Sequence, residues 1–268
     1  MTTPLLEIDR LGKAYPSRQG PVAAVDEVTF DVTAGEFVSV VGPSGCGKTT
    51  LMMGIAGLRS ITTGGVRLAG ETIDGPPEGL AVVFQDYSRS LFPWLTVQKN
   101  VALPLKDRHK SKTDVSEIVD RSLHAVGLDD TGHLHPWQLS GGMQQRVAIA
   151  RGLAQSPEIL LMDEPFASVD AQTRANLEDL VLDVWSEFGM TILFVTHDID
   201  EAVYLADRVV VLSPGPSTVK EIIPVPLPRP RDQIATKQLT EFTSLRSKVF
   251  KLVMGSRRHD RQTGPEEA

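Results

Sequence analysis

The chain has 268 residues, and its 41% hydrophobic content is that of a globular protein able to bury a substantial core. Its formal net charge of -7 gives no electrostatic reason to expect nucleic-acid binding, which normally requires a basic surface. The single cysteine, Cys46, excludes an intrachain disulfide framework and favours a reducing compartment.

The apolar runs of the chain bear on a membrane role. Residues 1–7 carry no basic stretch followed by an apolar run, so no secretory signal is expected. No apolar run approaches the roughly 20 residues that cross a bilayer as a helix. We therefore expect any membrane role to depend on a partner.

Two early segments alternate apolar and polar residues. They are residues 28–32 (VTFDV) and 65–70 (GVRLAG). This alternation is typical of half-buried antiparallel strands, because successive side chains of a strand point to opposite faces. The two segments predict a separate antiparallel edge sheet.

Four short apolar runs end at glycine or at a polar residue, which is typical of buried strands. They cover residues 37–41, 81–84, 159–162 and 191–195. Helical stretches follow some of them and predict an α/β fold with a parallel sheet covered on both faces. Ligands of such sheets collect beyond the carboxyl ends of the strands, so Gln85, Asp163 and His197 are expected to meet there.

The pattern between Gln85 and Asp163 is helical and predicts a helical subdomain at about residues 86–156. In one of its helices we expect Thr113 as the N-cap and Gly127 as the C-cap. The apolar face of that helix comprises Val115, Ile118, Val119, Leu123 and Val126.

The C-terminal part begins with residues 224–230 (PVPLPRP), which exclude a helix or a central strand. We therefore divide the chain into a domain at 1–223 and an extension at 224–268. The extension is predicted to hold a Pro-rich linker, a short helix and a polar, mobile tail at 255–268. The helix would carry one apolar stripe, formed by Ile234, Leu239, Phe242, Leu245, Val249 and Leu252.

Residues 42–50 (GPSGCGKTT) fit the phosphate-loop pattern G-x-x-x-x-G-K-[ST], between a predicted strand and a predicted helix. Glycines let successive N–H groups point at phosphate, and the helix N-terminus adds about half a positive charge. Lys48 would neutralise the terminal phosphates, and the Thr49 hydroxyl would ligate magnesium. The alternative is a glycine-rich turn with an incidental lysine. The predicted ATP-binding residues here are Gly42, Pro43, Ser44, Gly45, Cys46, Gly47, Lys48, Thr49 and Thr50.

Two carboxylates, Asp163 and Glu164, follow the apolar run at 159–162. Asp163 is placed to hold magnesium through water, and Glu164 to polarise a water aimed at the terminal phosphate. The alternative is a pair of carboxylates that caps a turn before Pro165. The neighbouring motifs favour the catalytic interpretation.

Residues 139–151 read LSGGMQQRVAIAR. A serine and two glycines opening a helix make a second anion site, although a glycine-initiated amphipathic helix is the alternative. The stretch resembles the signature motif of ATP-binding cassette (ABC) ATPases, normally L-S-G-G-Q, with Met143 in the last place. The resemblance covers about residues 5–223. It implies a phosphate-loop NTPase core with a parallel sheet, an antiparallel β edge subdomain and a helical signature subdomain.

In ABC ATPases the signature motif of one subunit closes over the nucleotide held by the phosphate loop of another. The resemblance therefore implies a homodimer joined by ATP. The residues that would act on the partner's nucleotide are Ser140, Gly141, Gly142 and Asp170. The resemblance also implies Mg²⁺ held by Thr49, Gln85 and, through water, Asp163.

Four further positions match the family. Tyr15 stands where an aromatic stacks on adenine, although an aromatic at a strand end can equally serve packing. Gln85 matches the Q-loop glutamine, which contacts magnesium or the attacking water. Asp170 matches the D-loop aspartate, with valine in the usual leucine position of residues 168–170. His197 matches the switch histidine, which contacts the terminal phosphate.

Three strings are similar to the ATPases of nitrate, sulfonate and taurine importers: 91–97 (LFPWLTV), 100–105 (NVALPL) and 227–231 (LPRPR). Segment 87–90 is more polar than expected for that group. The resemblance implies an importer of nitrate, sulfonate, taurine or a related small solute. An importer for another small molecule is the alternative, because the ATPase does not touch the cargo.

The resemblance also implies partners and a location. These are transmembrane permease subunits, an extracytoplasmic solute-binding protein and the cytoplasmic face of the inner membrane, where the chain would be peripheral. Residues 91–97 would form an apolar groove for a permease helix or fill the helical subdomain's own core. Two other classes of protein are alternatives. A soluble ABC ATPase acting on ribosomes or DNA usually has two cassettes or a long coiled coil, and this sequence shows neither. A phosphate-loop kinase has no signature helix, so residues 139–145 argue against it.

Overall fold

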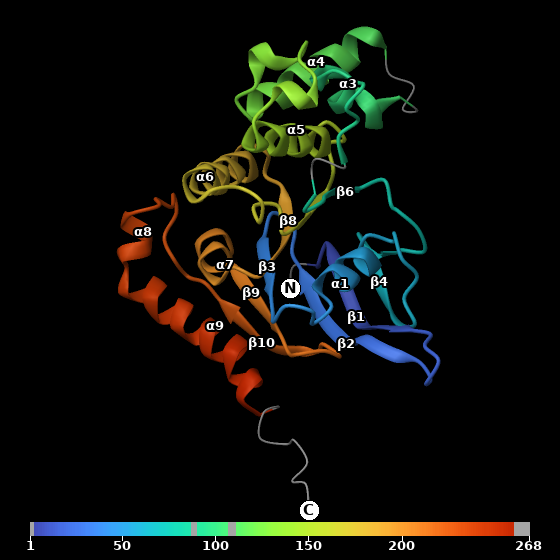
Figure 1. The fold of residues 1–268 in the computed structure, drawn as a ribbon, viewed down its shortest axis with the longest axis vertical. Coiled ribbons are helices and arrows are strands. Elements are labelled where there is room, and N and C mark those ends of the chain that lie inside the picture. Colours follow the sequence, from blue (N-terminus) through green and yellow to red (C-terminus); the bar gives the residue numbers. More distant parts are fainter. Residues whose placement is uncertain (1–2, 87–89, 107–110, 260–268) are drawn as a thin grey trace, which may run out of the picture. The chain divides into compact units, whose positions relative to one another are not determined.

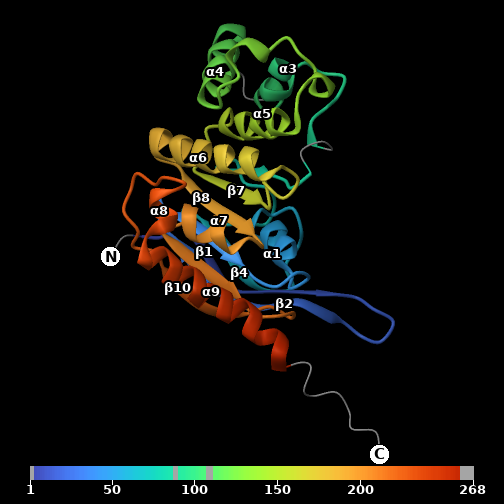
Figure 2. The same cartoon turned by 60° about the vertical axis from the view of Figure 1, so that its left-hand side comes forward.

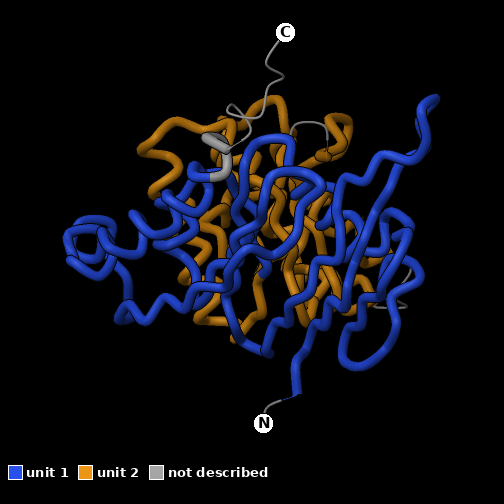
Figure 3. Tube along the Cα trace, turned by 90° about the horizontal axis from the view of Figure 1, so that it is seen from below, with its two compact units in different colours: residues 1–77, 193–268 blue, residues 78–192 orange. Residues whose placement is uncertain are grey.

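The computed structural model describes residues 3–86, 90–106 and 111–259. The chain forms two compact units (Figure 3). Unit 1 comprises residues 1–77 and 193–268, and unit 2 comprises residues 78–192. The proposed division at residues 223 and 224 follows other criteria and stays a prediction.

Unit 1 contains an antiparallel sheet with strand order β2-β1-β4-β5 (Figure 1). Strand β1 pairs antiparallel with β2 on one side and β4 on the other, so that Leu6 lies opposite both Val32 and Leu68. The predicted edge sheet is therefore confirmed. The strands are β1 (Leu6–Tyr15), β2 (Val22–Val32), β4 (Thr63–Leu68) and β5 (Glu71–Thr72).

A second set of strands in unit 1 has the order β10-β9-β3-β8. Strands β3 and β9 are parallel, whereas β10 pairs antiparallel with β9. All residues of β3 and β8 are buried, as predicted for the runs at 37–41 and 191–195. The strands are β3 (Phe37–Val41), β8 (Thr191–Thr196, with its first two residues in unit 2), β9 (Arg208–Leu212) and β10 (Val219–Pro224).

The helices of unit 1 pack on these strands. Helix α1 (Lys48–Ile55) contacts β1 and β2, and helix α7 (Ile199–Leu205) contacts β3 and β9. Near the end of the chain, α8 (Ala235–Gln238) is followed by α9 (Thr240–His259), which lies against α7 and β9 (Figures 1 and 2).

The C-terminal extension differs from the prediction in two ways. The expected single stripe is broken at Leu239, whose backbone is extended, so α8 and α9 are separate helices and Ile234 is 69% exposed. Helix α9 also continues to His259, beyond Gly255, where the polar tail was predicted to begin. Once packed through Val249, a helix extends at one hydrogen bond per added residue. Residues 260–268 lie outside the described residues.

The Pro-rich segment has neither helix nor strand after Pro224, but it is not a loose linker. Val225 and Leu227 are 4% and 6% exposed, and the Val225 N–H donates to the Asp207 carbonyl at 2.8 Å. The physical reason is an alternation of inward apolar residues with exposed prolines. Such a segment packs as an extended chain although proline cannot donate to a strand ladder.

Unit 2 pairs two parallel strands and carries the helices predicted between Gln85 and Asp163. Helices α3, α4 and α5 contact one another, and α5 also contacts β6 and α6. Its elements are β6 (Leu80–Val83), α3 (Val97–Ala102), α4 (Lys112–Ala125), α5 (Gly141–Leu153), β7 (Ile159–Asp163), α6 (Ala171–Phe188) and the 3₁₀ turns η1 (Leu103–Leu105), η2 (Asp129–Thr131) and η3 (Pro136–Gln138).

The start of α4 corrects one expected cap. The N-cap is Ser111 rather than Thr113, because the Ser111 hydroxyl accepts the Asp114 N–H and the Asp114 carboxylate accepts the Ser111 N–H. Two reciprocal bonds satisfy more free amides than one threonine could. At the other end the C-cap is Val126 rather than the expected Gly127, which follows it in a left-handed conformation at φ 65°.

Across the ranges that the structure describes, none of the helices has both the length and the hydrophobicity needed to span a bilayer.

Candidate functional site

The phosphate-loop residues 42–50 form a turn between β3 and α1 that only glycine can complete at two positions. Gly47 has φ 106°, and a Cβ there would lie 2.7 Å from the Ala24 carbonyl oxygen. At Gly42 a Cβ would lie 2.9 Å from the Cys46 sulfur. The sulfur of the buried Cys46 thus occupies the space next to Gly42. The loop backbone is held close to its surroundings because these side chains are missing.

Helix α1 begins at Lys48, and its N-cap Gly47 provides no side-chain hydrogen bond to the first turn. The first amides of a helix have no intrahelical partners, so this end can accept an anion. Lys48 is 6% exposed, and its Nζ donates to the carbonyls of Gly42 at 3.1 Å and Pro43 at 3.4 Å. The Lys48 ammonium group thus contacts the backbone of the phosphate loop. Thr49, with Ser44 and Gly45, is exposed.

Tyr15 lies at the end of β1 beside the first turn of α1. Its hydroxyl is 3.4 Å from the Thr50 hydroxyl and accepts a hydrogen bond from Arg59. The hydrogen bond with Thr50, followed by the nearby Arg59, lowers the pKa of Tyr15. Lys13 Nζ and the Arg59 guanidinium lie 5.4 Å and 5.5 Å from the ring centroid. Within unit 1 the predicted adenine-stacking residue and the phosphate loop therefore meet.

His197 follows β8 directly and is exposed, whereas Thr196 before it is buried. The Thr196 hydroxyl donates to Glu201 Oε2 at 2.6 Å and accepts the Asp198 N–H at 2.9 Å. Asp198 in turn caps α7 by accepting the amides of Asp200 and Glu201. The backbone on both sides of His197 is thus tied to the first turn of α7.

In unit 2, Asp163 ends β7 and is 3% exposed, and Glu164 comes next. Glu164 has φ 42°, a left-handed conformation that is uncommon for a residue with a side chain. Such strain costs on the order of 1–3 kcal/mol and is concentrated at functional sites. The predicted catalytic carboxylate therefore lies at a backbone position that packing alone does not favour.

The signature helix α5 starts at an exposed serine. The Ser140 hydroxyl accepts the Met143 N–H at 3.3 Å, which makes it the N-cap. Ser140 itself is exposed, so its hydroxyl proton can still reach a ligand. At Gly142 a Cβ would lie 2.6 Å from Thr173 Cγ2, so this glycine also permits α5 to approach the start of α6.

Asp170 is the N-cap of α6 and is exposed. Its carboxylate accepts the Gln172 and Thr173 amides and the Thr173 hydroxyl, and the hydroxyl is the main reason why the pKa of Asp170 is lowered. Gln85 lies just after β6 and is exposed. Tyr87, Ser88 and Arg89, whose polarity departed from the nitrate-importer pattern, lie outside the described residues.

Sequence reasoning missed Arg151 and Arg59. Arg151 in the last turn of α5 donates to the Ser90 carbonyl at 2.6 Å and to its hydroxyl at 3.0 Å, and burial lowers its pKa. It thereby ties the signature helix to the segment after Gln85. The signal for Arg151 was the basic residue that ends the motif at 139–151, whereas nothing local marked Arg59 as a partner of Tyr15.

Each unit thus brings some of the predicted residues together. Unit 1 joins Tyr15 to Thr50 and holds Lys48 in the loop. Unit 2 joins Gly142 to the cap of α6 beside Asp170. The roles predicted for these residues, and the meeting of both groups at one nucleotide, stay predictions.

The comparisons with known proteins agree on one family. Residues 25–167, more than half of the chain, match the family described as ABC transporter. The nitrate import ATP-binding protein NrtD of Synechococcus elongatus is 42% identical over 263 residues, 97% of this chain and 95% of that protein. The bicarbonate transport ATP-binding protein CmpD of Synechocystis sp. is 40% identical over 262 residues, 97% of this chain and 92% of that protein.

The fold comparison gives the same result. A structure described as the dimeric post-hydrolysis state of the ATP-binding cassette MJ0796 bound to ADP and Pi has a TM-score of 0.72 and 31% identity, covering 82% of this chain and 98% of that one. The predicted α/β phosphate-loop NTPase fold is confirmed. The chain belongs to the ABC transporter family, as an ATP-binding subunit whose ATPase activity is coupled to transport.

Proposed function

We propose that this subunit energises the import of a small solute, in the group that comprises nitrate, sulfonate, taurine and related compounds. The observation that carries the proposal is 42% identity with a nitrate import ATP-binding protein across 97% of the chain. A bicarbonate transport protein is 40% identical over the same share. Both named cargoes are small inorganic oxyanions, so nitrate and bicarbonate are the first candidates to test.

The residues present fit ATP with Mg²⁺. The amino end of α1 has no capping side chain, and Gly42 and Gly47 allow the loop backbone to pack in this turn. Thr49, Gln85 and, through water, Asp163 would hold the ion. Bound Mg²⁺ neutralises charge that develops on the transferred phosphoryl oxygens.

Glu164 and His197 would carry out the protein's part of hydrolysis. The Glu164 carboxylate orients a water and accepts its proton, and His197 donates a hydrogen bond to the terminal phosphate. Replacing Glu164 by Gln removes the proton acceptor and keeps the shape. We expect hydrolysis to fall about 100-fold or more while ATP still binds.

Two copies of the chain would share each nucleotide. Ser140 is exposed at the start of α5, as a group that acts on a partner must be. In the presence of ATP, Glu164→Gln should therefore accumulate as a dimer in size-exclusion chromatography with light scattering. A variant that stays monomeric with ATP bound would contradict the shared site.

The segment at 91–97 both fills the core of unit 2 and exposes an apolar surface. Leu91 and Val97 are 2% and 0% exposed, but Trp94 is 71% exposed and its ring centroid lies 5.2 Å from that of Phe92. The buried Asn100 holds the turn: its Oδ1 accepts the Phe92 N–H at 2.8 Å, and its Nδ2 donates to three carbonyls of the turn. A fixed, exposed Trp94 suits contact with a permease helix.

A cavity of about 370 Å³ is lined in part by Leu95, the residue after Trp94, and supports the same partner. It is lined by Leu95, Lys99, Ala102, Leu105, Lys106 and Val115. Docking to a permease here would place the subunit peripherally on the cytoplasmic face of the inner membrane. Trp94→Ala should then weaken co-purification of the permease without changing ATP binding.

The cargo is tested by purifying the complete transporter and screening its extracytoplasmic solute-binding protein. Stabilisation by nitrate or bicarbonate, but not by taurine, would support an oxyanion importer. Stabilisation by taurine or another sulfonate would reassign the cargo within the proposed group. Absence of any permease in the purified material would favour the soluble ABC ATPase instead.

A further inference from the structure

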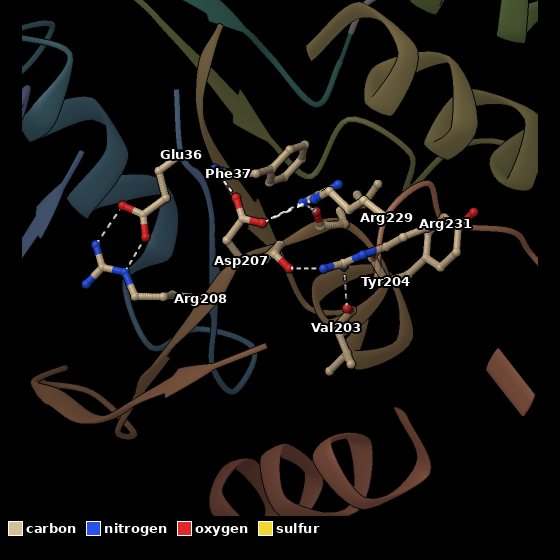
Figure 4. Close-up of polar contacts among 10 residues, drawn as sticks. Glu36, Phe37, Val203, Tyr204, Asp207, Arg208, Arg229 and Arg231 are labelled. Carbon is tan, nitrogen blue, oxygen red and sulfur yellow. Dashed lines mark hydrogen bonds and ion pairs between the residues drawn. The ribbon is translucent and has the colours of Figure 1, made fainter. Parts of the chain in front are cut away.

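The carboxyl end of α7 is closed by an arginine from the Pro-rich segment. The last carbonyls of a helix lack intrahelical donors and need other partners. Arg231 Nη1 donates to the Val203 carbonyl at 3.0 Å and also to that of Tyr204, and Nη2 donates to the Ala206 carbonyl at 2.8 Å (Figure 4). One guanidinium thus satisfies three of the four carbonyls at 203–206.

Arg229 satisfies the remaining carbonyl. Its Nη2 donates to the Leu205 carbonyl at 3.0 Å and to Asp207 Oδ1 at 2.8 Å. Asp207 Oδ2 accepts the Phe37 N–H at 2.9 Å, which links the same group to the start of β3 (Figure 4). The end of α7 is therefore fastened both to the Pro-rich segment and to the central strand β3.

The segment that carries these arginines is built to present them. Its prolines at 224, 226, 228 and 230 are exposed, whereas the residues between them turn inward. Val225 and Leu227 anchor the segment in the core, and Arg229 and Arg231 continue the same inward register. A fixed, extended segment therefore delivers both guanidinium groups to one helix end.

The helices that follow reach the rest of α7. Lys237 Nζ lies 4.7 Å from the centroid of the Tyr204 ring, at the carboxyl end of the helix. Arg246 of α9 forms an ion pair with Asp200, in the first turn of α7. The C-terminal residues 225–253 thus hold α7 at both ends.

The placement of α7 bears on His197, which lies two residues before the helix. A helix of 7 residues is far below the roughly 12–15 that are stable alone, so neighbouring groups determine where it lies. It is about 10 Å long at 1.5 Å per residue, and His197 is tied to its first turn through Thr196 and Asp198. The capped end of α7 is thus connected to the backbone beside the histidine by a short helix and these hydrogen bonds.

We propose that Arg231, assisted by Arg229, is a positioning residue for His197: the C-terminal segment caps α7 and thereby holds the histidine where it meets the terminal phosphate. The inference rests on the proposed role of His197. Burial lowers the pKa of Arg231 to about 10, so the site bears a cost of desolvation for this cation. The guanidinium spreads its donors over two Nη atoms, which together contact three carbonyls here, whereas lysine carries its three donors on a single nitrogen.

The test compares Arg231→Lys with wild type in the full-length chain, using single-turnover ATP hydrolysis and equilibrium ATP binding. We expect the hydrolysis rate to fall about tenfold or more and ATP affinity to stay unchanged, since small displacements of a catalytic group reduce rate. Lys220→Ala is the matched control, because Lys220 Nζ donates to the Leu252 carbonyl near the end of α9. It should keep the wild-type rate.

A double-mutant cycle separates positioning from general stability. In the His197→Ala background, Arg231→Lys should change the rate less than about twofold, because the residue that it positions is gone. An equal loss in both backgrounds would overturn the proposal and show a purely structural role. If His197→Ala alone keeps the wild-type rate, the proposed role of His197 fails instead.

A folding defect is controlled by a second variant. Arg229→Lys replaces the guanidinium that contacts the Leu205 carbonyl and Asp207 and keeps Arg231 itself, so its rate should lie between those of wild type and Arg231→Lys. Hydrogen exchange should show faster exchange in α7 and unchanged exchange in α1 for both variants. Wild-type rates in both folded variants would also overturn the proposal.

Discussion

Two helix ends in unit 1 satisfy their backbone groups in opposite ways. The amino end of α1 follows Gly47 and has no side-chain cap hydrogen bond. The carboxyl end of α7 has its carbonyls at 203–206 occupied by Arg229 and Arg231. Both kinds of end need partners. A helix end without a capping side chain is suited to bind a ligand. A helix end whose backbone groups are all capped is suited to fix the position of the helix in the fold.

Unit 2 offers an intermediate case within one subdomain. Helix α4 starts with a reciprocal pair, Ser111 and Asp114, whereas α5 starts with Ser140 alone. The additional carboxylate at α4 repels anions, and its absence at α5 leaves an amino end that tolerates phosphate. The same serine cap therefore serves framework in one helix and, as we propose, nucleotide in the other.

The largest effect on ATP turnover is expected at Lys48, the cation at the amino end of α1. Lys48→Ala removes the ammonium group that contacts the Gly42 and Pro43 carbonyls of the loop, and ATP turnover should fall about 100-fold or more. The measurement is steady-state ATPase activity together with binding of a fluorescent nucleotide. Wild-type activity in a folded Lys48→Ala variant would remove the phosphate-loop assignment.

Gly47→Ala tests whether the loop needs its backbone geometry. At φ 106°, with the Ala24 oxygen 2.7 Å from a new Cβ, alanine must displace the loop, and turnover should fall about tenfold or more. Gly20→Ala is the matched control. Gly20 has φ 109° with nothing within 4 Å of a Cβ, so it bears only the backbone cost of about 1–2 kcal/mol. Equal activity in the two variants would show that the loop tolerates the shift.

Ser140→Ala and Ser111→Ala sharpen the comparison of α5 with α4. Both remove an N-cap and should lower the free energy of unfolding by about 1 kcal/mol. Only Ser140→Ala should also reduce turnover, by about tenfold, because it removes a hydrogen bond to a charged phosphate. Thermal unfolding and ATPase assays on both variants provide the measurement. A matching loss of turnover in Ser111→Ala would assign the effect to helix stability.

The smallest effect on stability is expected at the carboxyl end of α4, where His124 and Asp129 form an exposed pair. His124 Nδ1 lies 2.7 Å from Asp129 Oδ1, and this bond raises the pKa of His124 and lowers that of Asp129. The raised pKa of the histidine contributes to folding stability at pH values below its ordinary pKa near 6.5. This contribution is lost as the pH rises through the raised pKa. The lowered pKa of the aspartate contributes to folding stability at pH values above its ordinary pKa near 3.9. This contribution is lost as the pH falls through the lowered pKa.

An NMR titration measures this pair directly. The His124 midpoint should be higher in wild type than in Asp129→Asn, where its carboxylate partner is absent. Identical midpoints would contradict the pair. The change in stability should stay small, because exposed ion pairs contribute little.

Local patterns predicted much of the fold. The apolar runs at 37–41 and 191–195 are buried strands, and the alternating segments lie in the antiparallel sheet. Competing local signals were less decisive: Thr113 is a good cap in isolation, but Ser111 wins because Asp114 completes a reciprocal pair. The apolar stripe of the C-terminal extension also hid the break at Leu239.

The sequence by itself determined the phosphate loop, the signature helix start and the family, because these depend on residue types at short, regular spacings. Only the tertiary structure decided where Arg229 and Arg231 act. Arg231 meets a carbonyl 28 residues earlier in the chain, and backbone carbonyls look alike in every sequence. Which of them an arginine reaches depends on how distant segments pack, and that packing makes a proline-rich string into the cap of a helix.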